Sequence, residues 1–86
     1  MNDYQINNII VDTLLKFGFD DDYIKYSSYK YKMFYNSIEN DSDYNSICTC
    51  MNLYFDKKEE KILFKILNKL GWKANRLDNY YFTKIK

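Results

Sequence analysis

The sequence predicts a small α+β protein in which two helices pack on a small antiparallel sheet, in the order α-β-β-α-β. Three observations support this fold class. Residues 56–70 combine helical periodicity with a start signal and a stop signal. Residues 29–35 and 47–55 alternate as strands do and are rich in strand-favouring side chains. The chain of 86 residues is 47% hydrophobic, enough for the core of a single domain that spans residues 1–86.

The first helix is predicted from Asn2 to Phe19. Asn2 and Gln5 have the spacing of a capping box, and Gly18 can supply a left-handed stop. The apolar residues of this stretch fall on two sides of the helix. The side expected to face the core carries Ile6, Ile9, Ile10, Thr13 and Phe17. The second stripe suits a partner or a homodimer contact, and it carries Tyr4, Val11 and Leu15.

The middle of the chain supports two interpretations. Residues 29–35 alternate and are aromatic, which favours a strand that pairs with residues 47–55 across the polar loop 39–45. Residues 20–38 also fit a helix, because seven of their side chains, all apolar or aromatic except one serine, share one helical face. These are Tyr23, Ile24, Ser27, Tyr31, Phe34, Tyr35 and Ile38. The helical alternative would make the domain mostly α.

The helix at 56–70 has the clearest signals. Asp56 and Glu59 form a capping box, and Gly71 follows the last periodic residue. The face expected to be buried carries Ile62, Leu63, Ile66, Leu67 and Leu70. A band of lysines repeats every fourth residue on the polar side: Lys57, Lys61, Lys65, Lys69 and Lys73. Residues 80–85 are predicted to form a final strand, with 72–74 pairing back as a short one.

The net charge of +1 conceals an uneven distribution. Residues 1–45 contain four lysines and eight acidic residues, a charge of −4, whereas residues 46–86 contain nine basic and four acidic residues, a charge of +5. This profile differs from the uniformly basic profile of a typical nucleic-acid binder. It allows either end to meet a partner of opposite charge.

The composition argues against an enzyme. Without histidine, Ser-His-Asp and Cys-His nucleophile systems are excluded. Two cysteines, Cys48 and Cys50, cannot complete a structural zinc site, and two glycines cannot build a phosphate-binding loop. We therefore predict no catalytic residues, no metal and no cofactor. The polar start of the chain and the lack of a ~20-residue apolar run predict a cytoplasmic protein without a membrane contact.

The first functional hypothesis is a non-catalytic protein-binding module. Tyrosine is abundant, with 10 in 86 residues, and exposed tyrosines favour interfaces. The richness in Asn, Lys, Ile and Tyr is typical of AT-rich genomes. In type alone, the chain resembles small phage or mobile-element inhibitors of host defence such as anti-CRISPR proteins, whose partners are host proteins or nucleoprotein complexes. The expected contact residues are Tyr23, Tyr26, Tyr29, Tyr31, Tyr35 and the lysine band with Arg76.

The alternative is a winged-helix-like DNA-binding protein. The basic helix at 57–70, followed by a hairpin at 72–85, loosely resembles a recognition helix and its wing. The side chains expected to touch phosphates are Lys61, Lys65, Lys69, Lys73 and Arg76.

Overall fold

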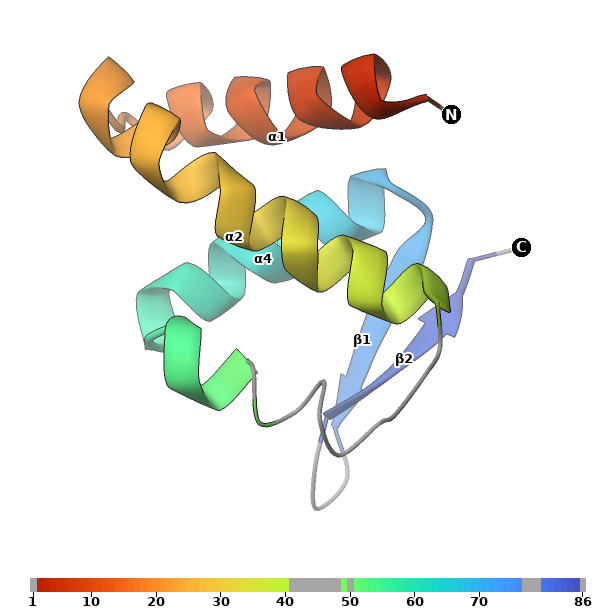
Figure 1. Cartoon of the computed structure of the whole chain (residues 1–86). Helices are drawn as coiled ribbons and strands as arrows, with labels where there is room; N and C mark the ends of the chain where they lie inside the picture. The colour runs from red at the N-terminus through yellow and green to blue at the C-terminus, as the bar shows by residue number, and fades with distance from the viewer. Residues whose placement is uncertain (1, 41–48, 50, 77–79, 86) are drawn as a thin grey trace.

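The computed structural model describes residues 2–40, 49, 51–76 and 80–85, with the backbone alone at Arg76 and Tyr80. In chain order the elements are helices α1 (Asp3–Lys16), α2 (Asp21–Asn40) and α4 (Lys57–Lys69) and strands β1 (Trp72–Arg76) and β2 (Tyr80–Lys84) (Figure 1). Residues 51–54 are helical as well. The α+β class is confirmed, but the helices come first and the strands form a hairpin at the end.

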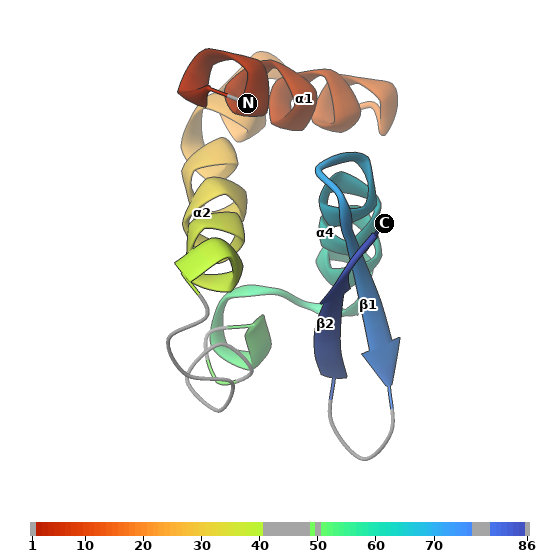
Figure 2. The same ribbon diagram turned by 90° about the vertical axis from the view of Figure 1, so that its right-hand side faces the viewer.

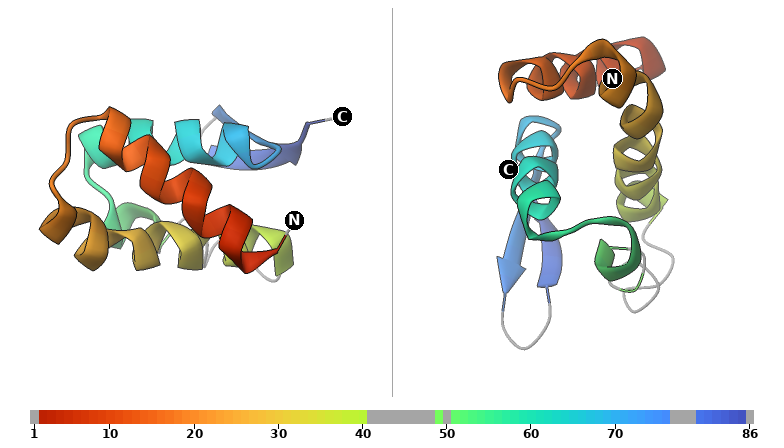
Figure 3. Two further views of the ribbon diagram at one scale, coloured as in Figure 1. Left: turned by 90° about the horizontal axis from the view of Figure 1, so that it is seen from above. Right: turned by 90° about the vertical axis from the view of Figure 1, so that its left-hand side faces the viewer.

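The helices enclose the core from three sides. Figure 2 shows α2 and α4 side by side, with α1 lying across one end of both. Seen from above, α1 crosses both helices (Figure 3). The chain at 54–55 lies beside the middle of α2, where the Tyr54 carbonyl accepts from Lys30 and the Phe55 ring meets Phe34. The hairpin runs back beside α4 (Figure 2). The core therefore lies between α1, α2 and α4, and the hairpin covers one flank.

Helix α1 begins and ends where its local signals predict. The Asn2 side chain accepts a hydrogen bond from the Gln5 amide at 2.9 Å, and Gln5 returns one to the Asn2 amide at 3.0 Å. Gly18 adopts a φ of 88°. Beyond it, the Phe19 amide donates to the Leu14 carbonyl at 3.3 Å, the bond expected of a Schellman stop. The predicted core side of α1 is nearly right. Phe17 was predicted to be buried but is exposed, and Leu14, which was not predicted, is buried instead.

The predicted strand at 29–35 is wrong, because these residues lie inside α2. The helical alternative for residues 20–38 is the correct one. All the residues that α2 buries belong to the helical face recognised in the sequence: Ile24, Ser27, Tyr31, Phe34, Tyr35 and Ile38. The strand preference of tyrosine is weak and depends on packing, so burial of one complete helical face decides the conformation.

The predicted strand at 47–55 is also wrong wherever the structure describes it. Residues 49 and 51–54 are helical. Met51 and Phe55 are four residues apart, so a helical turn buries both side chains at once. The Phe55 ring lies 5.1 Å from the Tyr31 ring and 5.7 Å from the Phe34 ring. The hairpin predicted between 29–35 and 47–55 does not form, and Cys48, Cys50 and residues 41–45 lie outside the described part.

Helix α4 confirms the two-sided pattern of its sequence. The Asp56 side chain accepts from the Glu59 amide at 2.8 Å, and the predicted capping box is complete. All five residues of the predicted apolar face are buried: Ile62, Leu63, Ile66, Leu67 and Leu70. Burial of this face fixes α4 against the core, because each such side chain contributes about 1.5–3 kcal/mol of hydrophobic free energy.

The hairpin is longer than predicted. Strands β1 and β2 pair antiparallel from Trp72 opposite Lys84 to Arg76 opposite Tyr80. Phe82 faces inward, with its ring 5.5 Å from Phe34 of α2 and 6.4 Å from Phe64 of α4. These ring contacts explain why Phe64, which lies outside the apolar face of α4, is partly buried. They attach the hairpin to both α2 and α4.

Candidate functional site

A cationic surface lies on the side of α4 that is turned away from the core. We call it the lysine face, and it consists of Lys57, Lys61, Lys65 and Lys69 of α4 with Lys73 of β1. All five side chains are exposed, as the sequence predicted. Lysines four residues apart are offset by about 40° around the helix, so the band winds slowly from the free side of α4 toward α1.

Helix α1 contacts two lysines in the C-terminal half of α4, Lys65 and Lys69. The Lys69 ammonium donates to Thr13 Oγ1 at 3.1 Å. The Lys65 ammonium lies 5.4 Å from the centre of the Phe17 ring, a cation–π distance. Within the described residues, no hydrogen bond or ion pair engages the ammonium groups of Lys57, Lys61 and Lys73. These three side chains are therefore the ones available to an anionic ligand.

The side of the hairpin that is turned away from the core carries Lys73. Because Phe82 points inward, the alternation of strands places Thr83, Tyr81, Lys73 and Asn75 on the opposite side. Asn75 Nδ2 donates to Thr83 Oγ1 at 3.0 Å across the strands. The side chain of Arg76, which the sequence also assigned to the contact surface, lies outside the described part of the chain.

The structure separates the five tyrosines assigned to the contact surface. Tyr31 has an exposed fraction of 0% and Tyr35 of 8%, so both belong to the core and cannot meet a partner. Tyr23 is half-buried, and its hydroxyl donates to Glu59 at 2.8 Å. Tyr26 and Tyr29 are exposed, at 90% and 67%. Only these two are available as contact residues.

Tyr29 borders an apolar groove of about 330 Å³ between α2 and the residues around 51–55. Its lining consists of Tyr29, Lys30, Met33, Phe34, Ser37, Tyr54 and Phe55. The sequence analysis did not identify Met33 or Tyr54, both of which are exposed. A helical interpretation of α2 could have found Met33, because Tyr26, Tyr29 and Met33 follow the i, i+3, i+7 spacing of a second stripe.

An ion pair joins α2 to the start of α4. The Lys30 ammonium contacts Glu59 Oε2 and also donates to the Tyr54 carbonyl at 3.0 Å. The Glu59 side chain is only 16% exposed, and that of Lys30 29%. Burial tends to raise the pKa of Glu59, but the hydrogen bonds from Lys30 and Tyr23 outweigh it and hold the pKa below its ordinary value. Glu59 therefore stays charged and fixes the first turn of α4 to α2.

A second polar contact ties α2 to the hairpin. Glu39 Oε1 accepts from Trp72 Nε1 at 2.9 Å and from the Lys84 ammonium at 3.1 Å. The hydrogen bond from Trp72 is the main reason that the pKa of Glu39 lies below its ordinary value. Burial, together with a hydrogen bond to Glu39, raises the pKa of Tyr35 to about 12, and burial also raises that of Tyr31.

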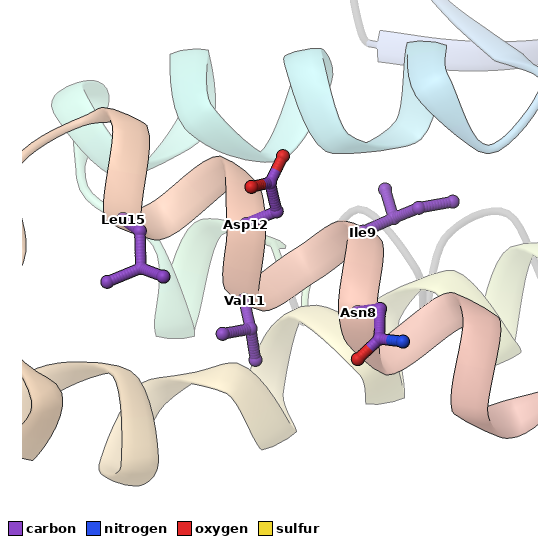
Figure 4. A pocket seen from close by; sticks show the side chains of 5 residues that line it. All are labelled: Asn8, Ile9, Val11, Asp12 and Leu15. Atoms are coloured by element: carbon purple, nitrogen blue, oxygen red, sulfur yellow. The ribbon is translucent and has the colours of Figure 1, made fainter.

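The stripe proposed as a dimer contact lies on the outside of α1. Tyr4 and Leu15 are exposed and Val11 is partly buried. An open hollow of about 490 Å³ follows this helix, lined by Asn8, Ile9, Val11, Asp12 and Leu15 (Figure 4). In Figure 4, Val11 and Leu15 point to one side of α1, whereas Ile9 and Asp12 point to the other. All five residues come from one helix, so the hollow is an open surface.

The lysine face and the apolar groove lie on different sides of the molecule. Helices α2 and α4 turn their buried residues toward a shared core, so their exposed sides point apart (Figure 2). The structure therefore does not combine the exposed tyrosines and the lysines into one contact surface, as the first functional hypothesis assumed. Each surface needs its own ligand.

The described residues contain no cluster of three or more His, Cys, Asp or Glu side chains that could hold a metal ion. Within the same ranges, no helix combines the length and apolar character that a membrane crossing requires. Comparisons with protein-family models, with curated proteins and with solved structures gave no match to this chain.

Proposed function

We propose that the protein binds nucleic acid through the lysine face and the outer side of the hairpin. The observation that supports this function is that α4, whose outer side carries the lysines, leads directly into an antiparallel hairpin that adds a further exposed lysine, Lys73. The helical residues 51–54, the short link at 55–56 and α4 also form a helix, turn and helix before the hairpin. This order is the one that the winged-helix-like alternative requires.

The differences between the predicted and the observed structure also affect the choice between the two hypotheses. The protein-binding hypothesis depended on five exposed tyrosines, and of these five the structure leaves only Tyr26 and Tyr29 fully exposed. The DNA-binding hypothesis depended on the exposed lysines, the buried face of α4 and the final hairpin. All three features are present in the structure.

Fluorescence anisotropy with a labelled 20-base-pair duplex tests the proposal. With three phosphate contacts from Lys57, Lys61 and Lys73, the affinity should fall about 40-fold between 50 and 200 mM KCl, because the slope against salt is about −0.9 per contact. Lys61→Ala should lower that slope by about one. Lys25→Ala is the matched control, since Lys25 is likewise an exposed lysine within a helix, on α2.

Two results would contradict nucleic-acid binding. The first is an unchanged anisotropy at 50 mM KCl with tens of micromolar protein, since phosphate contacts are strongest at low salt. The second is an equal loss of affinity for Lys25→Ala and Lys61→Ala, which would show that the lysine face has no special part in the binding.

The apolar groove supports a second candidate function, protein binding. Large apolar side chains on the surface around a hollow mark protein contacts. On this hypothesis the protein is a non-catalytic inhibitor of a host protein, of the anti-CRISPR type, and the groove receives that partner. A pull-down from a low-GC bacterial lysate should then recover a protein that Met33→Glu no longer captures. Ile85→Glu is the control, because Ile85 is an apolar residue outside the groove with an exposed fraction of 44%, close to the 50% of Met33. Recovery of no protein, or equal recovery by both variants, would exclude the groove.

A further inference from the structure

The side chains that the lysine face presents are suited to phosphates and poorly suited to bases. Recognition of bases in the major groove depends mainly on arginine, asparagine and glutamine, which make paired hydrogen bonds. On the outer side of α4, Asn68 is the exposed residue of this kind among the described side chains. A lysine ammonium is a compact charge without the planar set of paired donors that arginine has. Successive lysines of α4 are separated by about 6 Å along the helix axis. Such a row can follow a phosphate backbone.

The N-terminus of α4 does not add an anion site of its own. Helix N-termini bind phosphate through unpaired amides. Here Asp56 accepts from the Glu59 amide, and Glu59 accepts from the Asp56 amide at 3.3 Å. The two carboxylates also repel an approaching phosphate. Contacts must therefore come from the lysine side chains.

The aromatic rings near the lysine face do not form a stacking platform for unpaired bases. The Lys65 ammonium lies over Phe17, and the Lys58 ammonium lies 5.7 Å from the Phe19 ring centre. Phe64 packs near Phe82 of the hairpin. Single-strand binding proteins stack successive bases on open rings beside a basic groove. On this side the described residues leave two large aromatic side chains exposed, Tyr81 and Phe17, and the ring of Phe17 already lies against the Lys65 ammonium.

We infer that the ligand of the lysine face is double-stranded nucleic acid, held by its phosphates with little selection of sequence. This inference rests on the proposed function and deepens it. Charge complementarity selects the ligand: the unengaged ammonium groups of Lys57 and Lys61 on one rigid helix, together with Lys73 on the hairpin, suit the regular charge of a duplex backbone.

Two measurements on the whole protein test the inference. In anisotropy titrations at 50 mM KCl, a 20-base-pair duplex should bind at least fivefold more tightly than either of its single strands. Selection from a random 20-base-pair library should enrich no sequence motif. Asn68→Ala should change the duplex affinity less than twofold, whereas Lys61→Ala should weaken the binding of unrelated duplexes by the same factor.

The outcomes separate this inference from the proposed function. An enriched motif, a single strand that binds as tightly as the duplex, or a large loss of affinity with Asn68→Ala would overturn the inference and leave nucleic-acid binding intact. Binding to neither duplex nor single strand at low salt would overturn both. Circular dichroism spectra of the Lys61 and Asn68 variants should match that of the unaltered protein, because both positions are exposed.

Discussion

Replacing Lys30 with methionine should destabilise the protein by about 2 kcal/mol at pH 7, because a hydrogen bond to a charged group contributes about 1.5–3 kcal/mol and the partner is left nearly buried. The Lys30 ammonium contacts the Glu59 carboxylate, which is 16% exposed, and lies 5.1 Å from the Phe55 ring centre. Methionine keeps most of the apolar stem of lysine, so the loss reports on the ammonium group.

A double-mutant cycle isolates the contribution of the pair. Glu59→Gln should cost about 1–2 kcal/mol, because glutamine can still complete the capping box but carries no charge. The double variant Lys30→Met/Glu59→Gln should lose about 1 kcal/mol less than the sum of the single losses, as residues in direct contact do. Each loss should lower the melting temperature by about 4–8 °C per kcal/mol.

The pH dependence gives the cycle a second readout. The pKa of folded Glu59 lies below its ordinary value of 4.5, so its charged form stabilises the fold. This contribution is complete above the unfolded pKa and is lost as the pH falls through the lower folded value. The effect of Lys30→Met should therefore shrink between pH 6 and pH 3.

Urea unfolding followed by circular dichroism measures each free energy. Lys16→Met is the control, because Lys16 pairs with Asp12 at 3.1 Å on the exposed side of α1. Its loss should stay below about 0.5 kcal/mol. Losses that add within about 0.3 kcal/mol would refute the claim that Lys30 and Glu59 act as a coupled pair.

Three further predictions concern the helix stop, the buried phenol and the attachment of the hairpin. Gly18→Ala should cost about 1–2 kcal/mol in urea unfolding, purely from backbone strain at a φ of 88°, since no atom lies within 4 Å of the added carbon; no loss would show that the left-handed turn is not required. The pKa of Tyr35 is about 12, above the ordinary 10.0, so the stability that its protonated hydroxyl contributes is complete below pH 10 and is lost as the pH rises to 12. Tyr35→Phe should therefore remove a late step from the ultraviolet titration of the tyrosines. A titration that keeps this step would contradict the assignment. Trp72→Phe removes the donor to Glu39 and should cost about 1 kcal/mol; a stability equal to that of the unaltered protein would show that this bond does not hold the hairpin.

The exposed surfaces differ in how far the sequence predicts them. The lysine face follows from a four-residue repeat on a helix with strong end signals, so it could be placed without the fold. The groove could not, because Tyr29 and Met33 become its wall only when residues 51–55 lie beside α2. Composition does not show which tyrosines the core encloses, so the sequence alone could not place Tyr31 and Tyr35 in the core.

Local chemistry alone determined the ends and the faces of α1 and α4. Their capping boxes, glycine stops and apolar stripes involve residues within one or two helical turns, so short-range hydrogen bonds and periodicity specify them. Residues 29–35 carry two periodicities and neither is decisive locally, whereas residues 47–55 show only the alternation of a strand. Tertiary packing chose the helix for both where the structure describes them, because only helices bring Tyr31, Phe34 and Phe55 into one core and let Lys30 reach Glu59.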